Sequence, residues 1–461
     1  MELKNNLYLE SSPYLQQHKH NPVHWQAWSK DVLSFAKENK KSILLSIGYA
    51  TCHWCHVMAH ESFEDEETAR LMNKYFVNIK VDREERPDID YIFQRSYQLF
   101  NQSGGGWPLT IFLDENSIPF MAGTYFPKIN SHGLPSFKEV ISKVGETYAT
   151  QRAEIIKQSH IISKSLELKK SLVLNQNLES ILLSIMSSLD EVKGGYRGSP
   201  KFPLFNIYEV LLFFFNKTKK LDYLKPVELI LKQLCSQGIY DHVEGGISRY
   251  TIDEHWLVPH FEKMLYDNAQ FVLLLSKYIN IEKNKYFEKK IIQTIDFINK
   301  NFINPDNKLL GSAYDADSDK EEGKYYTFSY EELKEIEDID HYFEVKPEGN
   351  WENKIILKEI KLPTERILLE LKLLRKKKNK PFFDSKVQLD LNCLWVSALL
   401  SAEKILPNNN FLILAENYYK NLEKIFFSKE RLQHTILKPE VFLEDYAYSI
   451  AMLLDLYDQT L

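Results

Sequence analysis

The segment SILLSIGYATCHWC, residues 42–55, places an aliphatic stretch directly before two cysteines that are separated by two residues. An apolar, β-branched run followed by a short turn predicts a buried strand that leads into a helix. Cys52 would then lie at the helix N-terminus, where unpaired backbone N–H groups and the helix dipole favour a thiolate. Cys55 would lie one turn further on. The segment therefore predicts a redox dithiol on an α/β scaffold, in which Cys52 attacks a disulfide and Cys55 resolves the mixed disulfide.

Three other interpretations of these residues stay open. Residues 52–56 also match the C-x-x-C-H pattern of covalent haem attachment, with His56 as the axial ligand, but the N-terminal segment lacks the export signal that this attachment requires. Zinc could be held by Cys52, Cys55, His56 and His60, although structural zinc sites usually join two separated ligand pairs. The third interpretation is a pair of buried cysteines without a function. We favour the redox dithiol and expect no metal and no cofactor.

The residues after the dithiol have the pattern of a thioredoxin-like domain. Residues 76–82 alternate as a strand, residues 89–100 predict a helix, and a strand that begins at Pro108 and ends at Leu113 predicts a hairpin with residues 118–121. Thioredoxin folds keep a cis peptide facing the dithiol where a strand begins at proline. We therefore expect a cis Trp107–Pro108 bond, which would offer the Trp107 backbone and Pro108 to an extended substrate segment.

Composition narrows the possible partners and compartments. The chain has 461 residues, a net charge of −6 and a pI near 6.2, which argues against nucleic acid as an obligate partner. No apolar run approaches the ~20 residues that span a bilayer. Four cysteines in so long a chain indicate a reducing compartment, so we expect a cytoplasmic protein. Cys235 and Cys393 stand in apolar stretches as packing residues, and the basic run at residues 375–380 is interpreted as a solvated loop.

Beyond about residue 150 the apolar residues recur at three- and four-residue steps, which predicts a succession of helices. Successive helices with glycine-rich and aromatic loops suggest hairpins that close around an axis, as in an (α/α) toroid. We expect a thioredoxin-like domain with an N-terminal extension over residues 1–143, a helical linker over 144–170, and an (α/α) six-hairpin-like toroid, expected to be incomplete, over 171–461.

Two loops of the helical part carry many acidic, basic and aromatic side chains. Carboxylates and a histidine beside flat aromatic rings could bind a carbohydrate and act as acid and base. The possible site residues in these loops are Arg249, Asp253, His260, Glu262, Asp315 and Asp317. The alternative, which we favour, is a buried ion-pair network that fixes the loops, for instance His260, Glu262 and Lys263 with Asp315 or Asp317.

The chain resembles the family of spermatogenesis-associated protein 20 and its bacterial relatives over nearly its whole length. Short motifs carry the resemblance: residues 14–18, 21–23, 46–49, 52–58, 61–63, 81–88, 105–108, 123–127, 200–203 and 256–268. The resemblance implies a thioredoxin-like domain joined to a six-hairpin (α/α) barrel similar to glycosidases and N-acylglucosamine 2-epimerases. It also implies a thiol–disulfide role for the CxxC motif.

The dithiol departs from thioredoxins proper at one position. Thioredoxins place an acid six residues before the first cysteine, to take the proton of the resolving thiol, whereas this chain has Ser46 there. Another base must serve, and His53 or His56 is the candidate. Trp54 is expected to fill the rim of the active site.

The helical part departs from the family as well. Tyr314 stands where the family is expected to have Glu, and Leu391 where it is expected to have Trp. A toroid without these side chains would serve as a scaffold or binding surface. The sequence therefore predicts a thiol–disulfide oxidoreductase that acts on protein thiols and disulfides, with a toroid that docks the partner. The alternatives are a carbohydrate-active toroid and a binding scaffold with a relic dithiol.

Overall fold

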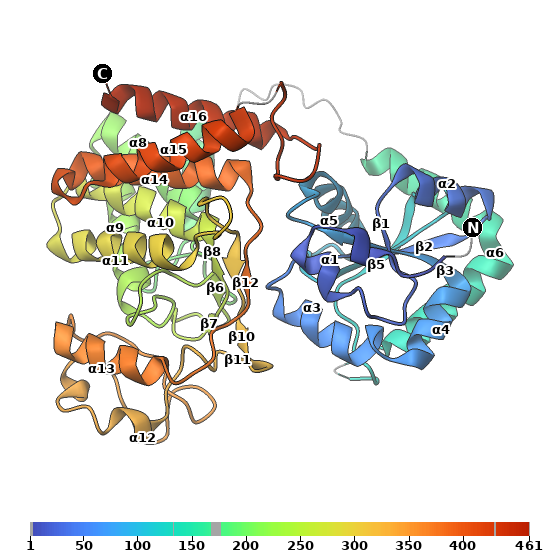
Figure 1. The fold of residues 1–461 in the computed structure, drawn as a ribbon, viewed down its shortest axis with the longest axis horizontal. Helices are drawn as coiled ribbons and strands as arrows, with labels where there is room; N and C mark the ends of the chain where they lie inside the picture. The colour runs from blue at the N-terminus through green and yellow to red at the C-terminus, as the bar shows by residue number, and fades with distance from the viewer. Residues whose placement is uncertain (1–2, 132, 167–176, 428–429, 461) are drawn as a thin grey trace. The chain divides into compact units, whose positions relative to one another are not determined.

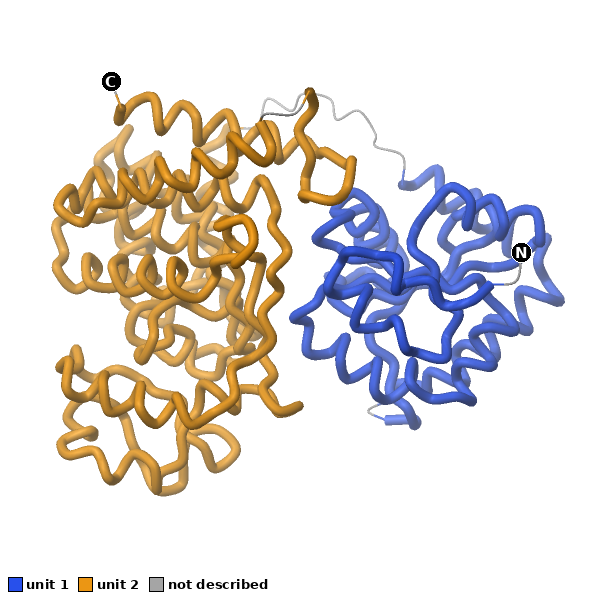
Figure 2. The backbone as a smooth tube through the Cα atoms, viewed as in Figure 1, with its two compact units in different colours: residues 1–174 blue, residues 175–461 orange. Residues whose placement is uncertain are grey.

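The computed structural model describes residues 3–131, 133–166, 177–427 and 430–460. The chain divides into two compact units, residues 1–174 and 175–461 (Figure 2). We refer to them as the thioredoxin-like unit and the helical unit.

The thioredoxin-like unit is built on one five-stranded sheet with the order β1-β3-β2-β4-β5. The central strand, β2, pairs parallel with β3 and antiparallel with β4, and all its residues are buried. The predicted strands and hairpin are confirmed, whereas β1 was not predicted. The strands are β1 (Gln26–Ala27), β2 (Ser42–Gly48), β3 (Phe76–Asp82), β4 (Leu109–Leu113) and β5 (Pro119–Gly123).

Helices cover both faces of this sheet (Figure 1). Side chains alternate along a strand, so Ile43, Leu45 and Ile47 of β2 share one face, where they form a core with α2 and α5. Ser46 and its neighbour in β3, Lys80, share the opposite face. The helices are α1 (Pro13–Gln17), α2 (Lys30–Glu38), α3 (His53–Met58), α4 (Glu66–Tyr75), α5 (Pro87–Asn101) and α6 (Phe137–Leu166).

The segment predicted to link the domains, residues 144–170, contributes most of α6. That helix packs on α4 and β5 and belongs to the thioredoxin-like unit. Residues 167–170 of the predicted linker lie outside the described residues.

The helical unit is a stack of antiparallel helical hairpins of the (α/α) toroid type (Figure 1). Helices pack in the pairs α8 with α9, α10 with α11 and α14 with α15, and α14 also packs on α10 and α16. One continuous apolar core joins them, and Cys235 and Cys393 are free and buried in it, as predicted. The helices are α7 (Leu178–Ser187), α8 (Phe205–Thr218), α9 (Leu221–Ser236), α10 (Leu265–Ile279), α11 (Lys285–Asn301), α14 (Leu389–Ile405), α15 (Phe411–Leu422) and α16 (Leu443–Thr460).

The polar loops of the helical unit are more regular than their sequence indicates, because short strands pair within them. One group has the order β12-β9-β8, and two pairs join β6 to β7 and β10 to β11. Two further helices, α12 (Tyr330–Leu333) and α13 (Glu365–Arg375), pack around a separate small apolar cluster. The strands are β6 (Tyr250–Thr251), β7 (Pro259–His260), β8 (Lys263–Met264), β9 (Ala313–Tyr314), β10 (Asp317–Ser318), β11 (Glu321–Glu322) and β12 (Phe383–Asp384).

Candidate functional site

The two cysteines of the CxxC motif form a disulfide at the start of α3. Cys52 is the N-cap residue of α3, and its Sγ accepts a hydrogen bond from the backbone N–H of Cys55 at 3.3 Å. This is the position in which a helix N-terminus stabilises a thiolate, because its first N–H groups have no partner within the helix. Both cysteine side chains are buried, while Trp54 between them is 46% exposed. The predicted pairing of Cys52 with Cys55 is therefore confirmed.

The predicted cis peptide is present at Trp107–Pro108, directly before β4. The Trp107 indole N–H donates to Asp90 Oδ1 at 2.8 Å, and the Arg83 guanidinium lies 4.1 Å from the centre of the Trp107 ring. These contacts fix the Trp107 side chain. Its role and that of Pro108 in binding a substrate remain predictions.

An acid–phenol pair that the sequence did not indicate lies beside the CxxC helix. Tyr125 donates its hydroxyl to Glu61 Oε2 at 2.6 Å, and its ring lies 5.1 Å from that of Trp54. Burial, followed by the interaction with Glu61, raises the pKa of Tyr125 above its ordinary value. Tyr125 therefore stays a neutral donor, and its ring packs against the exposed Trp54.

The two histidines proposed as bases both lie on α3. His53 is the first residue of the helix and contacts the Trp54 ring, and His56 follows one turn later. Their part in proton transfer remains a prediction. Three of the four residues proposed as zinc ligands have other partners in this structure, because the Cys52 and Cys55 sulfurs are bonded to each other and His60 pairs with Glu64 at 3.0 Å.

Lys80 is a second feature that the sequence analysis missed. It lies on β3 opposite Ser46, and its Nζ is 3.1 Å from the Ser46 hydroxyl oxygen. A lysine at an inward-facing position of an alternating strand is itself a signal, because lysine is almost never fully buried without a partner. The Lys80 amine thus lies next to Ser46, the residue that stands where thioredoxins have an acid.

In the helical unit, His260 lies between two glutamates. Its Nδ1 is 2.7 Å from Glu322 and its Nε2 is 3.1 Å from Glu262, which also pairs with Arg249 at 3.3 Å. The Tyr250 ring stacks on the imidazole at 4.9 Å between centroids. Burial lowers the pKa of His260, but the two carboxylates outweigh it and raise that pKa to about 10. His260 is therefore a cation within an ion-pair chain.

Of the remaining predicted residues of the helical unit, Asp253 and Asp315 accept hydrogen bonds from the backbone of their own loops. Asp253 accepts hydrogen bonds from the backbone N–H groups of residues 255, 257 and 258, and Asp315 accepts one from the N–H of Asp317. The loops are therefore joined by an ion-pair network that includes the predicted His260 and Glu262, but the predicted partner of Lys263 differs. Lys263 pairs with Asp241 in place of Asp315 or Asp317.

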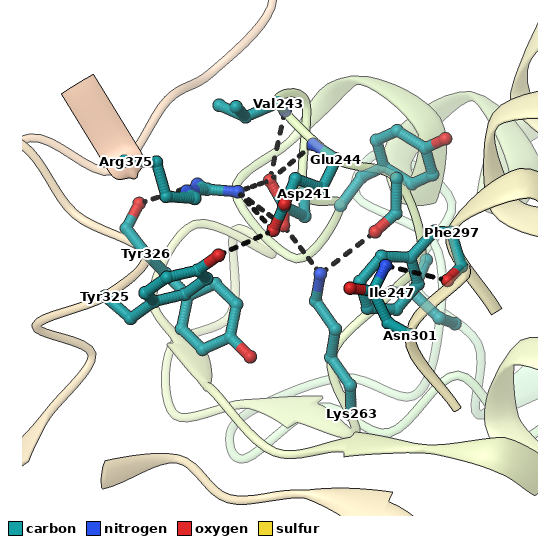
Figure 3. Close-up of polar contacts among 12 residues, drawn as sticks. Asp241, Val243, Glu244, Ile247, Lys263, Phe297, Asn301, Tyr325, Tyr326 and Arg375 are labelled. Atoms are coloured by element: carbon teal, nitrogen blue, oxygen red, sulfur yellow. Dashed lines mark hydrogen bonds and ion pairs between the residues drawn. The ribbon is translucent and has the colours of Figure 1, made fainter. Parts of the chain in front are cut away.

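Asp241 is the centre of a buried ion cluster in the helical unit (Figure 3). Its carboxylate accepts from Lys263 Nζ at 2.6 Å and from Arg375 Nη1 at 2.7 Å, and all three side chains are buried. Burial acts to raise the pKa of Asp241, but the two cations hold it below its ordinary value. The interpretation of Arg375 as part of a solvated basic loop is wrong, because α13 ends at Arg375 and directs its guanidinium inward.

The space beside this cluster is small. A cavity of about 20 Å³ is lined by Asp241 and Arg375, and another of about 10 Å³ is lined by Glu244 and Tyr325. Sites for small molecules usually enclose ~300–1,000 Å³. The first cavity has room for about one water molecule.

The ionised state of His260 predicts a pH dependence of stability. Its pKa is about 10 in the folded chain and ~6.5 when unfolded, so its contribution is complete below pH ~6.5 and is lost as the pH rises through about 10. We expect the free energy of unfolding of the wild-type helical unit to fall by roughly 1–4 kcal/mol between neutral pH and pH ~10. Urea titrations across this range should show a shallower decline for His260→Gln. Equal slopes for the two proteins would contradict a charged His260.

The chain thus combines a thioredoxin-like CxxC unit with a helical unit of antiparallel hairpins. A family model described as "Thioredox_DsbH: Protein of unknown function, DUF255" matches residues 4–167. The uncharacterized protein B0495.5 of Caenorhabditis elegans is 31% identical over 98% of this chain and 71% of its own length. Human spermatogenesis-associated protein 20 is 30% identical over 98% of this chain and 67% of its own length. The chain belongs to the spermatogenesis-associated protein 20 family.

Solved structures resemble the chain only distantly. A family 76 glycoside hydrolase from a bovine Bacteroides thetaiotaomicron strain is 13% identical, with a TM-score of 0.39 over 61% of this chain and 50% of its own. A similarity at this level has no bearing on substrate. Within the described residues, none of the helices combines the length and apolar character needed to cross a bilayer.

Proposed function

We propose that this protein is a thiol–disulfide oxidoreductase that exchanges electrons with protein disulfides through Cys52 and Cys55. One observation carries the proposal: the disulfide lies at the N-terminus of α3, where Cys52 Sγ already accepts a backbone N–H. In the reduced protein the same N–H group would stabilise the Cys52 thiolate, which is the nucleophile of disulfide exchange.

The reaction proceeds in two exchanges. The Cys52 thiolate attacks one sulfur of the partner's disulfide, the partner's S–S bond breaks, and one partner thiolate leaves. Cys55 then loses its proton and attacks Cys52 Sγ, which releases the second partner thiolate. Two electrons have passed to the partner, whose disulfide is now a dithiol, and Cys52–Cys55 is the oxidised product. The reverse sequence oxidises a partner dithiol.

A Cys55→Ser variant tests the proposal, because Cys52 can still attack but the mixed disulfide is no longer resolved. We expect this variant to retain a small recurrent set of proteins from a cell extract through a bond that dithiothreitol releases. The matched control carries Cys52→Ser as well. The same proteins bound by the control, or none bound by Cys55→Ser, would contradict the proposal.

Within this proposal the helical unit docks the partner protein. The acidic and basic side chains of its loops are engaged with one another, which supports docking over carbohydrate chemistry at these loops. A protein with both Cys52→Ser and Cys55→Ser that still converted a sugar would support the carbohydrate alternative.

A further inference from the structure

The N-terminal extension reaches the CxxC motif through the short helix α1. The Ser12 hydroxyl donates to Asp82 Oδ2 on β3 at 2.6 Å, and Gln17 Nε2 donates to the Ala50 carbonyl in the loop before α3 at 3.0 Å. Helix α1 is therefore fastened at one end to the sheet and at the other to the loop that carries the dithiol. Tyr14 lies between these two attachments.

The Tyr14 hydroxyl and the Cys55 sulfur converge on Gly48. A Cβ atom at Gly48 would lie 2.4 Å from Tyr14 Oη and 2.7 Å from Cys55 Sγ, so only glycine leaves room for both. Tyr14 is fully buried, and its hydroxyl makes no hydrogen bond to any residue that the structure describes. A buried hydroxyl without a partner is costly, and this one lies on the same side of Gly48 as the Cys55 sulfur.

Tyr14 stays protonated in this environment. Burial and then the Asp82 carboxylate raise its pKa above the ordinary value. The Ser46 hydroxyl partly offsets this rise, so it lies near Tyr14, although the geometry falls short of a hydrogen bond. Tyr14 can therefore pass a proton by accepting one and releasing its own, but it is not itself the final acceptor.

The acceptor at the end of this path is Lys80. Its Nζ contacts the Ser46 hydroxyl and is enclosed by the rings of Tyr14, Trp25 and Phe63, at 5.1, 4.7 and 4.4 Å from their centres. Among the described residues Lys80 has no ion-pair partner. Burial without a counter-charge lowers its pKa well below the ordinary value.

We propose that Lys80, as a neutral amine, takes the proton of the Cys55 thiol through the hydroxyls of Tyr14 and Ser46 when Cys55 resolves the mixed disulfide. The inference rests on the proposed thiol–disulfide function. The Cys55 S–H bond breaks, each hydroxyl accepts one proton and releases another, and Lys80 becomes an ammonium ion. The electron pair left on Cys55 Sγ forms the bond to Cys52 Sγ, and the partner leaves as a thiolate. Tyr14 and Ser46 act as relay groups, and Lys80 replaces the acid of thioredoxins.

The groups around Lys80 are consistent with a neutral resting amine. His18 lies beside Tyr14 and Phe63, and burial holds its pKa well below the ordinary value, so it carries no charge near neutral pH. Asp82 shares the face of β3 with Lys80, but its carboxylate accepts from the Ser12 hydroxyl and from the Glu84 N–H. Neither group supplies a paired charge to Lys80.

The two exchange steps can be observed separately with the reduced full chain and one equivalent of 5,5′-dithiobis(2-nitrobenzoate). Attack by Cys52 releases the first thionitrobenzoate, and resolution by Cys55 releases the second. Tyr14→Phe removes only the hydroxyl, and Lys80→Met replaces the amine with an apolar chain of similar length. Tyr148→Phe is the control, because it removes another buried hydroxyl of the same unit, one that donates to Glu115.

We expect Tyr14→Phe to slow the second release by about 10-fold near neutral pH, and Lys80→Met to slow it by about 100-fold. The first release should change by less than about twofold in both. The deficit of Lys80→Met should close as the pH rises past the ordinary thiol pKa of ~8.5, because the thiol then ionises without a base. Tyr148→Phe should match the wild type.

A second release that keeps its wild-type rate in Tyr14→Phe and Lys80→Met would overturn the proton path. Equal slowing of both releases would also overturn it, because a merely structural role affects both steps. If Lys80→Met fails to fold, the Tyr14→Phe rates decide the matter alone. A wild-type protein that releases no thionitrobenzoate would instead contradict the thiol–disulfide function itself.

Discussion

Replacing Cys52 with serine is expected to reduce the rate of insulin disulfide reduction to that of uncatalysed exchange, a loss of at least roughly 1,000-fold. A hydroxyl at the N-cap of α3 can accept the Cys55 N–H in place of the sulfur, so the helix keeps its cap. It does not ionise near neutral pH, and therefore the nucleophile is lost while the fold remains. The measurement is the turbidity of reduced insulin with dithiothreitol as electron donor.

Cys393→Ser is the matched control for this result. Cys393 is a free, buried cysteine of the helical unit, and burial raises the pKa of its thiol to about 12, so it contributes no thiolate. Serine retains the contact with the Ser449 hydroxyl that the sulfur makes at 3.5 Å. Insulin reduction should therefore proceed at the wild-type rate. Activity that survives Cys52→Ser, or a Cys52 pKa at or above the ~8.5 of a free thiol, would contradict the assigned nucleophile.

The second large effect is expected in the helical unit, where Asp241→Asn should lower the free energy of unfolding by about 3–5 kcal/mol. Asparagine is close in size to aspartate, but it carries no charge to balance Lys263 and Arg375. Both cations are buried, so solvent does not replace the lost carboxylate. Urea unfolding of the full chain at neutral pH measures the loss, followed by tryptophan fluorescence.

Glu228→Gln provides the comparison for a solvent-exposed ion pair. Glu228 pairs with Lys232 one turn later on α9, and water screens both groups, so the expected change is below about 0.5 kcal/mol. The Asp241→Asn protein should still release thionitrobenzoate at the wild-type rate, which shows that the thioredoxin-like unit is intact. A loss no larger than that of Glu228→Gln would mean that the Asp241 cluster does not hold the loops of the helical unit together.

Local patterns predicted the elements around the dithiol because their causes are local. The aliphatic run of β2 has to be buried, Cys52 can cap a helix only at its first turn, and β4 begins at Leu109, directly after the proline at which the strand is predicted to begin. The alternation of side chains along residues 76–82 predicts the strand β3, but by itself it does not assign a function to any residue of that strand. Reading its inward positions as a set would have drawn attention to the buried amine of Lys80.

The ion pairs in the loops of the helical unit could not be predicted from local sequence patterns. Arg375 belongs to a basic run that resembles a solvated loop, but its partner, Asp241, lies 134 residues earlier in the chain. Charge pattern along a sequence reports the local environment, whereas an ion pair depends on which distant segments the fold brings together. The same reason explains why Lys263 was assigned the wrong carboxylates.

The sequence by itself determined the family, the two classes of structure and the place of the two cysteines at the start of a helix, because spacing within a few residues fixes each of them. Only the tertiary structure decided what surrounds the resolving sulfur. Tyr14, Ser46 and Lys80 are far apart in the chain. Helix α1, which is hydrogen-bonded to the sheet and to the loop before α3, brings the Tyr14 hydroxyl to Gly48, where the Cys55 sulfur also lies. Burial then sets their protonation states, and burial is a property of the packed molecule rather than of any residue in it.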